Sequence, residues 1–74
     1  MPSPTAEKKQ LAAFGRRVKE LRVAAGMTQA CLAEQADLAI RNIQRIEAGE
    51  LNILLTTMVR LANALQVRPG EFFD

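Results

Sequence analysis

Apolar side chains recur at spacings of three and four residues along the first third of the chain. This period is typical of one face of an α-helix, and Gly26 predicts its end because glycine readily adopts the left-handed backbone that terminates helices. Residues 1–5 contain prolines and small polar side chains, which predict a disordered start with Ser3 or Thr5 as the helix cap. The members of the apolar stripe are Leu11, Phe14, Val18, Leu21 and Ala25.

Two short helices are predicted next. Thr28 is expected to be the N-cap of the first, since its hydroxyl can accept an open backbone N–H. The phase of the apolar pattern resets at 37–39, which predicts a turn, and Gly49 is expected to end the second helix. The inward-facing residues are Leu32, Ala33 and Ala36 on the first helix, and Ile43 and Ile46 on the second.

A fourth helix is predicted to begin within 54–57, and a last short helical turn to open at Pro69. The stretch 51–55 is apolar enough to resemble a strand, but an isolated strand would have no partner, so we interpret it as a loop and helix start. The predicted fold class is all-α, with five helices in a single domain over 1–74. The apolar residues of the last two helices are Leu55, Met58, Leu61, Ala62 and Leu65, then Phe72 and Phe73.

The residue inventory excludes several kinds of chemistry. The 74 residues contain no histidine and one cysteine, Cys31, which leaves no histidine base, no His/Cys zinc site and no intrachain disulfide. We therefore predict no enzyme activity, no metal and no cofactor. Cys31 is interpreted as a half-exposed helix residue, with a redox-sensing thiol as the alternative. No apolar run approaches the roughly 18 residues of a membrane span, so we expect a cytoplasmic protein without membrane contact.

Charge is divided unevenly along the chain. The net charge is only +2, but residues 1–26 carry six Lys and Arg against two Glu, whereas 27–74 carry four Arg against six acidic residues. A balance this small does not by itself indicate a nucleic-acid partner, so the question is whether the arginines converge on one surface. For Lys8 and Lys9 a solvated helix face remains an equal alternative.

The stretch 28–49 has the plan of a helix-turn-helix: a short helix, a turn of about three residues and a second short helix. Where two such helices cross, the first needs a small side chain, and Ala33 supplies it. Asp37 can occupy the turn because aspartate tolerates a positive φ, although less well than glycine. Ile43 can then fill the crossing from the second helix. From spacing alone, an ordinary helical hairpin that binds nothing remains open.

Three motifs in this order resemble one known family. They are TQACLAE at 28–34, IQRIEAG at 43–49 and LANALQV at 61–67. Together with Leu21-Arg22 before the first turn, they resemble the Cro/C1-type (XRE) helix-turn-helix family, which includes lambdoid phage repressors and many small bacterial regulators. The resemblance covers Phe14 to Phe73. The loop at Asn52 and the closing Phe72-Phe73 resemble, more narrowly, the controller proteins of restriction–modification systems.

The resemblance implies a five-helix, lambda-repressor-like domain with its helix-turn-helix at about 28–48. It also implies a transcriptional regulator that binds double-stranded DNA. One short helix reads too few base pairs for genomic specificity, so we expect a homodimer on an inverted-repeat operator whose half-sites lie about 34 Å apart. No small-molecule effector is evident. The alternative is a protein-interaction or antitoxin-like module of the same fold, motivated by the small net charge and the apolar 51–55.

In this family the recognition helix, here 39–48, lies in the major groove, and its outward side chains meet base edges. With Ile43 and Ile46 inward, four residues remain outward. Arginine suits the O6/N7 edge of guanine, glutamine can pair with adenine, and an apolar side chain can contact the thymine methyl group. The predicted base-contact residues are Ile40, Arg41, Gln44 and Arg45.

Other residues receive supporting roles. Gln29 begins a helix whose open N–H groups favour a phosphate, and Asn42 and Asn52 are further candidate phosphate contacts. The resemblance places Arg22 and Glu47 together as a partly buried ion pair of architectural function.

This chain departs from the family pattern at its helix caps. Asp37 replaces the usual glycine of the turn, Ala39 replaces the usual Ser/Thr cap, and Cys31 replaces the glutamate of a capping box. Weak caps leave more of the stability to packing or to a dimer partner. Phe72 is expected in the core. The predicted dimer interface consists of Leu51, Ile53, Leu54 and Phe73.

Overall fold

The computed structural model describes residues 4–73, which form four α-helices and one 3-10 helix. No strand occurs within these residues, so the all-α class is confirmed and 51–54 is a loop. The prediction of five helices needs one correction, because the last element is a five-residue 3-10 turn. The elements are α1 (Pro4–Ala24), α2 (Gln29–Ala36), α3 (Ile40–Glu47), α4 (Leu55–Leu65) and η1 (Pro69–Phe73).

The start of α1 differs from the expectation of a disordered 1–5. The helix already includes Pro4 and Thr5, and proline suits a first helical turn because its missing N–H would have no partner there. Thr5 therefore lies inside the helix and is not its cap, while Ser3 is outside the described residues. The other end agrees with the prediction, since Gly26 has φ 72°. Ala25, expected in the inward stripe, is exposed in the turn after α1.

The helix-turn-helix has one side-chain cap and one missing cap, as its sequence predicts. The Thr28 hydroxyl accepts the backbone N–H of Cys31 at 3.0 Å. Asp37 turns the chain in the left-handed region with φ 57°. Ala39 has an extended backbone and makes no capping hydrogen bond with its side chain. A second left-handed residue, Gln66 at the end of α4 with φ 57°, was not anticipated.

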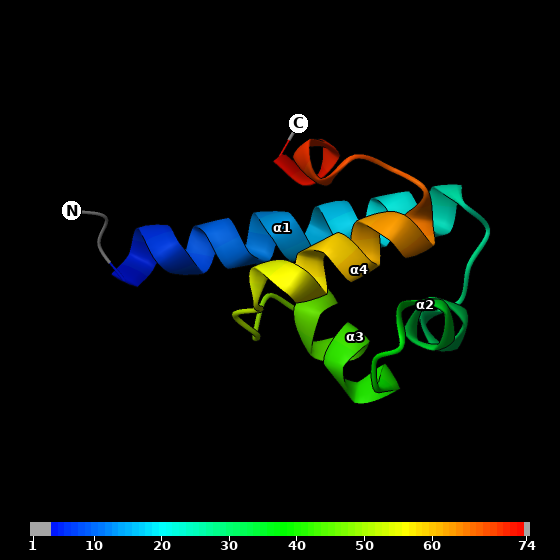
Figure 1. Ribbon diagram of the computed structural model, residues 1–74. Helices are drawn as coiled ribbons and strands as arrows, with labels where there is room; N and C mark the ends of the chain where they lie inside the picture. Colours follow the sequence, from blue (N-terminus) through cyan, green and yellow to red (C-terminus); the bar gives the residue numbers. More distant parts are fainter. Residues whose placement is uncertain (1–3, 74) are drawn as a thin grey trace.

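The core takes buried side chains from all five elements, whose arrangement is shown in Figure 1. The helices α2 and α3 pack against each other on one side of the molecule, and η1 returns over α1 on the other. The Phe72 ring meets the Phe14 ring edge-on at 5.1 Å between centroids, which confirms Phe72 as core. Leu55, which has the spacing of the apolar residues of α4, is 70% exposed. The remaining buried apolar residues are Val18, Leu32, Ala33, Ala36, Ile43, Ile46, Leu61, Ala62, Ala64 and Leu65.

Two glycines allow the end of α3 to lie directly against α1. A Cβ on Gly15 would stand 2.2 Å from the carbonyl oxygen of Ile46, so only a glycine allows this approach. Gly49, with φ 75°, ends α3 as predicted, and a Cβ there would lie 2.9 Å from the Cα of Ala12. The end of α3 is therefore seated on α1 through backbone contact.

None of the helices in the described part of the chain combines the length and apolarity needed to cross a lipid bilayer.

Candidate nucleic-acid interface

Helix α3, the predicted recognition helix, has two clearly different faces. Ile43 and Ile46 are 0% and 1% exposed and fix the orientation of the helix. The four predicted base-contact residues lie on the opposite side: Ile40 is 45% exposed, and Arg41, Gln44 and Arg45 are also exposed. The structure thus brings together on one surface the four side chains to which the sequence assigned this role.

Arg41 and Arg45 carry the charge of this surface. Between residues 4 and 73 the ion pairs are Arg17–Glu20 and Arg22–Glu47, so neither outward arginine has an acidic partner within the described chain. Residues four apart in a helix lie on the same side. Two guanidinium groups are therefore presented together, each with a planar set of donors suited to phosphate or to a guanine edge.

The first turn of α2 provides a second set of donors. The first N–H groups of a helix have no partner within that helix, and the Thr28 hydroxyl takes only the N–H of Cys31. The backbone of Gln29 and Ala30 is thus open to an anion. The side chain of Gln29 has a different partner, because its Nε2 donates to Oε1 of Glu47 at 3.1 Å.

Glu47 also forms the ion pair with Arg22 that the family resemblance implied. Arg22 donates from Nε to Oε2 at 2.6 Å and from Nη2 to Oε1 at 3.0 Å, while its Nη1 donates to the carbonyl oxygen of Met27 at 2.8 Å. The two side chains are only 11% and 5% exposed. The hydrogen bond to Glu47 raises the pKa of Arg22 above its ordinary value, and the charge of Glu47 adds to this although burial opposes it. The pair is architectural in position, since it joins α1 and the turn after it to α3.

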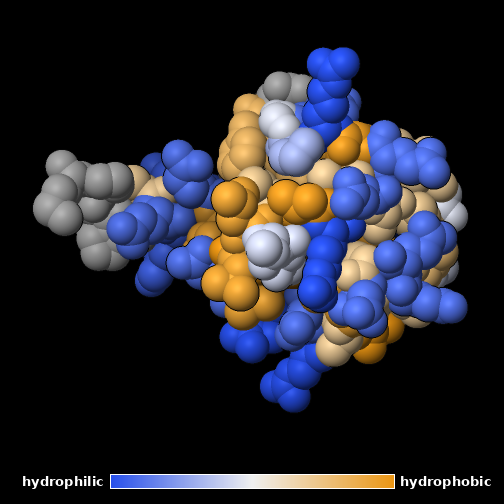
Figure 2. All heavy atoms as spheres, in the orientation of Figure 1, coloured by the Kyte–Doolittle hydropathy of each residue, from blue (hydrophilic) through white to orange (hydrophobic). Residues whose placement is uncertain are grey.

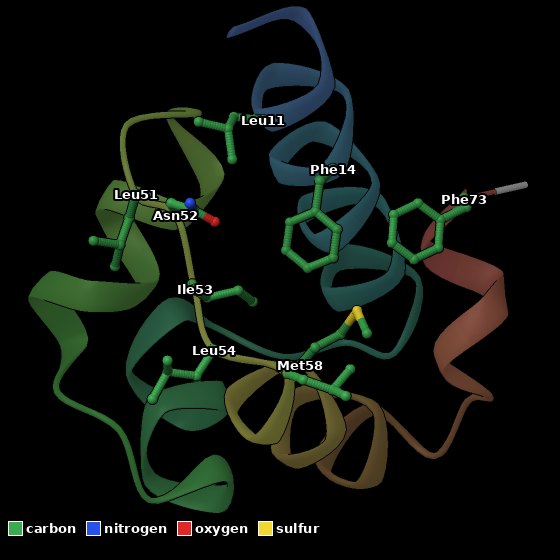
Figure 3. Close-up of a pocket in the computed structure, with 9 residues that line it drawn as sticks. Leu11, Phe14, Leu51, Asn52, Ile53, Leu54, Met58 and Phe73 are labelled. Atoms are coloured by element: carbon green, nitrogen blue, oxygen red, sulfur yellow. The ribbon is translucent and has the colours of Figure 1, made fainter. Parts of the chain in front are cut away.

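The two asparagines predicted as phosphate contacts lie in different surroundings. Asn42 belongs to α3 and is half-buried. Asn52 is exposed in the loop between α3 and α4, where it borders an apolar groove (Figure 3). The structure therefore does not place Asn52 with the outward side chains of α3.

The apolar groove lies between α1, the loop 51–54, the start of α4 and η1 (Figure 3). It has a volume of about 290 Å³. In the orientation of Figure 2, hydrophobic side chains gather over the loop and the start of α4. The lining residues are Leu11, Phe14, Leu51, Asn52, Ile53, Leu54, Leu55, Met58 and Phe73.

The predicted interface residues divide into two groups at this groove. Leu54 and Phe73 are 74% and 64% exposed, whereas Leu51 and Ile53 are half-buried and pack on the core. Leu51 and Ile53 therefore contribute to the core as well as to the lining of the groove. Leu55, which ends the apolar stretch 51–55, also lines the groove and is 70% exposed.

Within residues 4–73, no cluster of His, Cys, Asp and Glu could hold a metal ion. Cys31 is half-buried on α2, and its Sγ receives a long hydrogen bond of 3.5 Å from Nε2 of Gln35. Neither observation adds a reactive centre to the surface.

Comparison with known proteins agrees with this geometry. The family model described as helix-turn-helix matches residues 18–72. The control protein C.BamHI of Bacillus amyloliquefaciens is 34% identical over 62 residues, which are 82% of this chain and 76% of the relative. An uncharacterized HTH-type transcriptional regulator of Sinorhizobium fredii, y4aM, is 30% identical over 60 residues. These make up 81% of this chain, which spans only 42% of that relative's length.

Among solved structures, the restriction–modification controller protein C.AhdI from Aeromonas hydrophila superposes with a TM-score of 0.86. Its sequence is 37% identical, and the match covers 88% of this chain and 98% of the other. The chain belongs to the Cro/C1-type helix-turn-helix family of DNA-binding regulators.

Proposed function

We propose that this protein is a homodimeric, sequence-specific regulator of transcription that binds an inverted-repeat operator in double-stranded DNA. The observation that carries the proposal is the pair Arg41 and Arg45, exposed on α3 without an acidic partner in the described chain. The opposite face of the same helix is locked by Ile43 and Ile46. The recognition helix, with its flanking residues 39–48, enters the major groove.

Each outward residue has a defined chemistry toward a base. Arg41 and Arg45 present donors to the O6 and N7 atoms of guanine, and at least one of them reads a base. Gln44 pairs with adenine, and the apolar Ile40 contacts a thymine methyl group. A well-placed bidentate contact of this kind contributes about 1–3 kcal/mol of discrimination against the wrong base.

Phosphate contacts fix the register of the helix without reading sequence. The open N–H groups at Gln29, reinforced by the positive end of the α2 dipole, bind a phosphate beside the major groove. Asn42, at the edge of α3, donates from its amide to the backbone. Asn52 contacts a phosphate only if its exposed amide reaches over the rim of the apolar groove, so it is the weakest member of this set.

Two features support dimerisation: the short length of α3 and the apolar groove. An eight-residue helix contacts only a few base pairs, and two copies across one helical turn supply the rest. The exposed Leu54 and Phe73, with the half-buried Leu51 and Ile53 behind them, provide an apolar surface around the groove, as expected of a protein interface. We assign the two-fold contact to this surface.

Selection from random duplexes tests the proposal. An inverted repeat with half-sites about one helical turn apart is expected. The double variant Arg41→Ala/Arg45→Ala should lose binding to the selected operator while remaining a dimer in sedimentation. The matched control is Arg68→Ala, an exposed arginine in the loop between α4 and η1, which should bind as the parent does. If the selection at moderate salt recovered no preferred sequence, the proposal of a sequence-specific regulator would be refuted.

The exposed apolar groove also favours a second candidate, a protein-interaction or antitoxin-like module of the same fold. Its apolar rim could hold a different protein in place of a second copy. In that case the same double arginine variant would leave partner binding unchanged, and an apolar-to-charged change at Leu54 would abolish it. Sedimentation of the parent protein alone distinguishes the two candidates. A dimer in the absence of any other protein favours the first.

A further inference from the structure

The carboxylate of Glu47 joins three helices at one point. Glu47 belongs to the last turn of α3, and its side chain is 5% exposed. Its two oxygens accept from Arg22 of α1, and Oε1 accepts in addition from Nε2 of Gln29 at the first position of α2. A buried carboxylate that accepts several donors is held in one orientation, because turning would leave charge without partners.

The bond from Gln29 closes the open end of the helix-turn-helix. The turn at 37–39 connects the end of α2 to the start of α3, and Ala33 and Ile43 are both buried in the core there. The start of α2 and the end of α3 lie at the opposite end of the pair, where no connecting turn holds them. There the hydrogen bond of 3.1 Å from Gln29 to Glu47 ties the two helices together.

This tie is separable from the ion pair. Arg22 reaches Glu47 with two donors and also holds the Met27 carbonyl, so the carboxylate keeps its charged partner if the amide is removed. Gln29 therefore adds no compensation of charge. What it adds is a fixed distance between the first turn of α2 and the last turn of α3.

We propose that the side chain of Gln29 is a positioning residue for DNA recognition: through Glu47 it sets the recognition helix relative to the phosphate-binding start of α2. The inference rests on the proposed function. The backbone of Gln29 contacts a phosphate, whereas its side chain contacts protein. The phosphate contact at the start of α2 and the base contacts of α3 are then held at a fixed distance from each other. Loss of the side-chain bond misplaces Arg41 and Arg45 at the base edges while the phosphate contact remains.

The test compares Gln29→Met with the parent protein. Methionine keeps the length and the backbone N–H but has no donor for Glu47. Gln29→Lys is the rescue variant, because its ammonium group can donate to Oε1 of Glu47. Gln35→Met is the matched control, since Gln35 lies on α2 with its amide toward Cys31 and not toward Glu47. Fluorescence anisotropy measures affinity for the selected operator and for a scrambled duplex, at a temperature where thermal unfolding shows every variant folded.

The readout is the ratio of operator affinity to scrambled-duplex affinity. Gln29→Met should lower this ratio about tenfold, as expected when one charge-assisted bond that fixes geometry is lost, with unchanged affinity for the scrambled duplex. Gln29→Lys should restore the ratio, since its added charge strengthens binding to both duplexes alike. If methionine makes the protein unfold, Gln29→Glu, which opposes Glu47 with a second carboxylate, should lower the ratio in its place.

Three results would overturn the positioning role. An equal loss of affinity for both duplexes would make the side chain a direct phosphate contact. An unchanged ratio in Gln29→Met would leave the bond without a function in recognition, and failure of Gln29→Lys to restore the ratio would show that a donor to Glu47 is not what matters. A parent protein without any preferred duplex would instead refute the proposed regulator itself.

Discussion

Replacing Gly15 by alanine should destabilise this protein, although the same change in a helix interior normally stabilises. Alanine has a higher helix propensity than glycine by about 1 kcal/mol. Gly15 lies in the middle of α1, so propensity alone predicts a gain. The added methyl group, however, would lie 2.2 Å from the carbonyl oxygen of Ile46 and 3.0 Å from that of Glu47. Packing and helix propensity therefore predict opposite signs for the change in the free energy of unfolding.

The geometry sets the size of the effect. Ordinary contact begins near 3.4 Å, so α1 and the end of α3 must separate by about 1 Å to admit the methyl group. The Ile46 carbonyl cannot turn away freely, because it accepts the N–H of Gly49 at 3.0 Å. Overpacking costs typically 1–3 kcal/mol, and a rigid backbone neighbour justifies a cost near the upper limit of that range. After subtracting the propensity gain, we expect a net loss of about 2 kcal/mol.

Such a loss is large for a domain of this size. Stability of about 0.05–0.15 kcal/mol per residue gives a 74-residue chain roughly 4–11 kcal/mol in total. At about 4–8 °C per kcal/mol for small domains, the Tm should fall by roughly 8–16 °C. Urea unfolding followed by circular dichroism measures the same difference as a lower midpoint, with an unchanged slope if the unfolded state is unaffected.

Two control variants separate packing from propensity. Ala13→Gly, at an exposed position of the same helix, should cost about 1 kcal/mol through propensity alone. Gly70→Ala adds a methyl group where nothing lies within 4 Å, and its effect should be close to zero. If Gly15→Ala raised the Tm, or if it matched Gly70→Ala, the close approach of α1 to α3 would be refuted.

Three further predictions concern the helix cap, the ion pair and the interface. Ala39→Ser supplies the missing N-cap of α3 and should raise stability by about 1 kcal/mol in urea unfolding; an unchanged midpoint would contradict the cap assignment. Arg22→Met leaves Glu47 buried without its cation and should cost about 3 kcal/mol, most of which Arg22→Met/Glu47→Leu should recover. Leu54→Asp combined with Phe73→Asp should convert the expected dimer to monomers in sedimentation, and a dimer that persists would remove this surface from the interface.

The sequence predicted the helix-turn-helix well because its signals are local. Thr28 caps α2, Asp37 adopts a left-handed turn, and the spacing of Ile43 and Ile46 fixes which face of α3 is buried. Each of these outcomes depends on chemistry within a few residues of chain. The same periodicity left the arginines at 41 and 45 outward, which is the feature that supports the proposed function.

What the sequence did not predict depends on contacts between distant segments. Gly15 looked like an ordinary helix residue, although a glycine inside a helical stretch is itself a signal of close backbone approach. Leu55 has the spacing of the buried stripe, yet α4 begins at that residue and its first turn extends past the core. The amide of Gln29 meets Glu47 across 18 positions of sequence, and no periodic pattern records such a pair.

These contacts show an uneven distribution of stabilising interactions around the recognition helix. The end of α3 is fixed by the Gly15 approach, by the Arg22–Glu47 pair and by Gln29. Its beginning has no side-chain cap at Ala39, so its first N–H groups are open at the end that carries Arg41. A capping side chain there would satisfy a donor that could otherwise face a phosphate. Under the proposed function, an uncapped start would sacrifice stability at the turn that faces DNA, and the firmly held end would keep the helix in place while the first turn adjusts to the major groove.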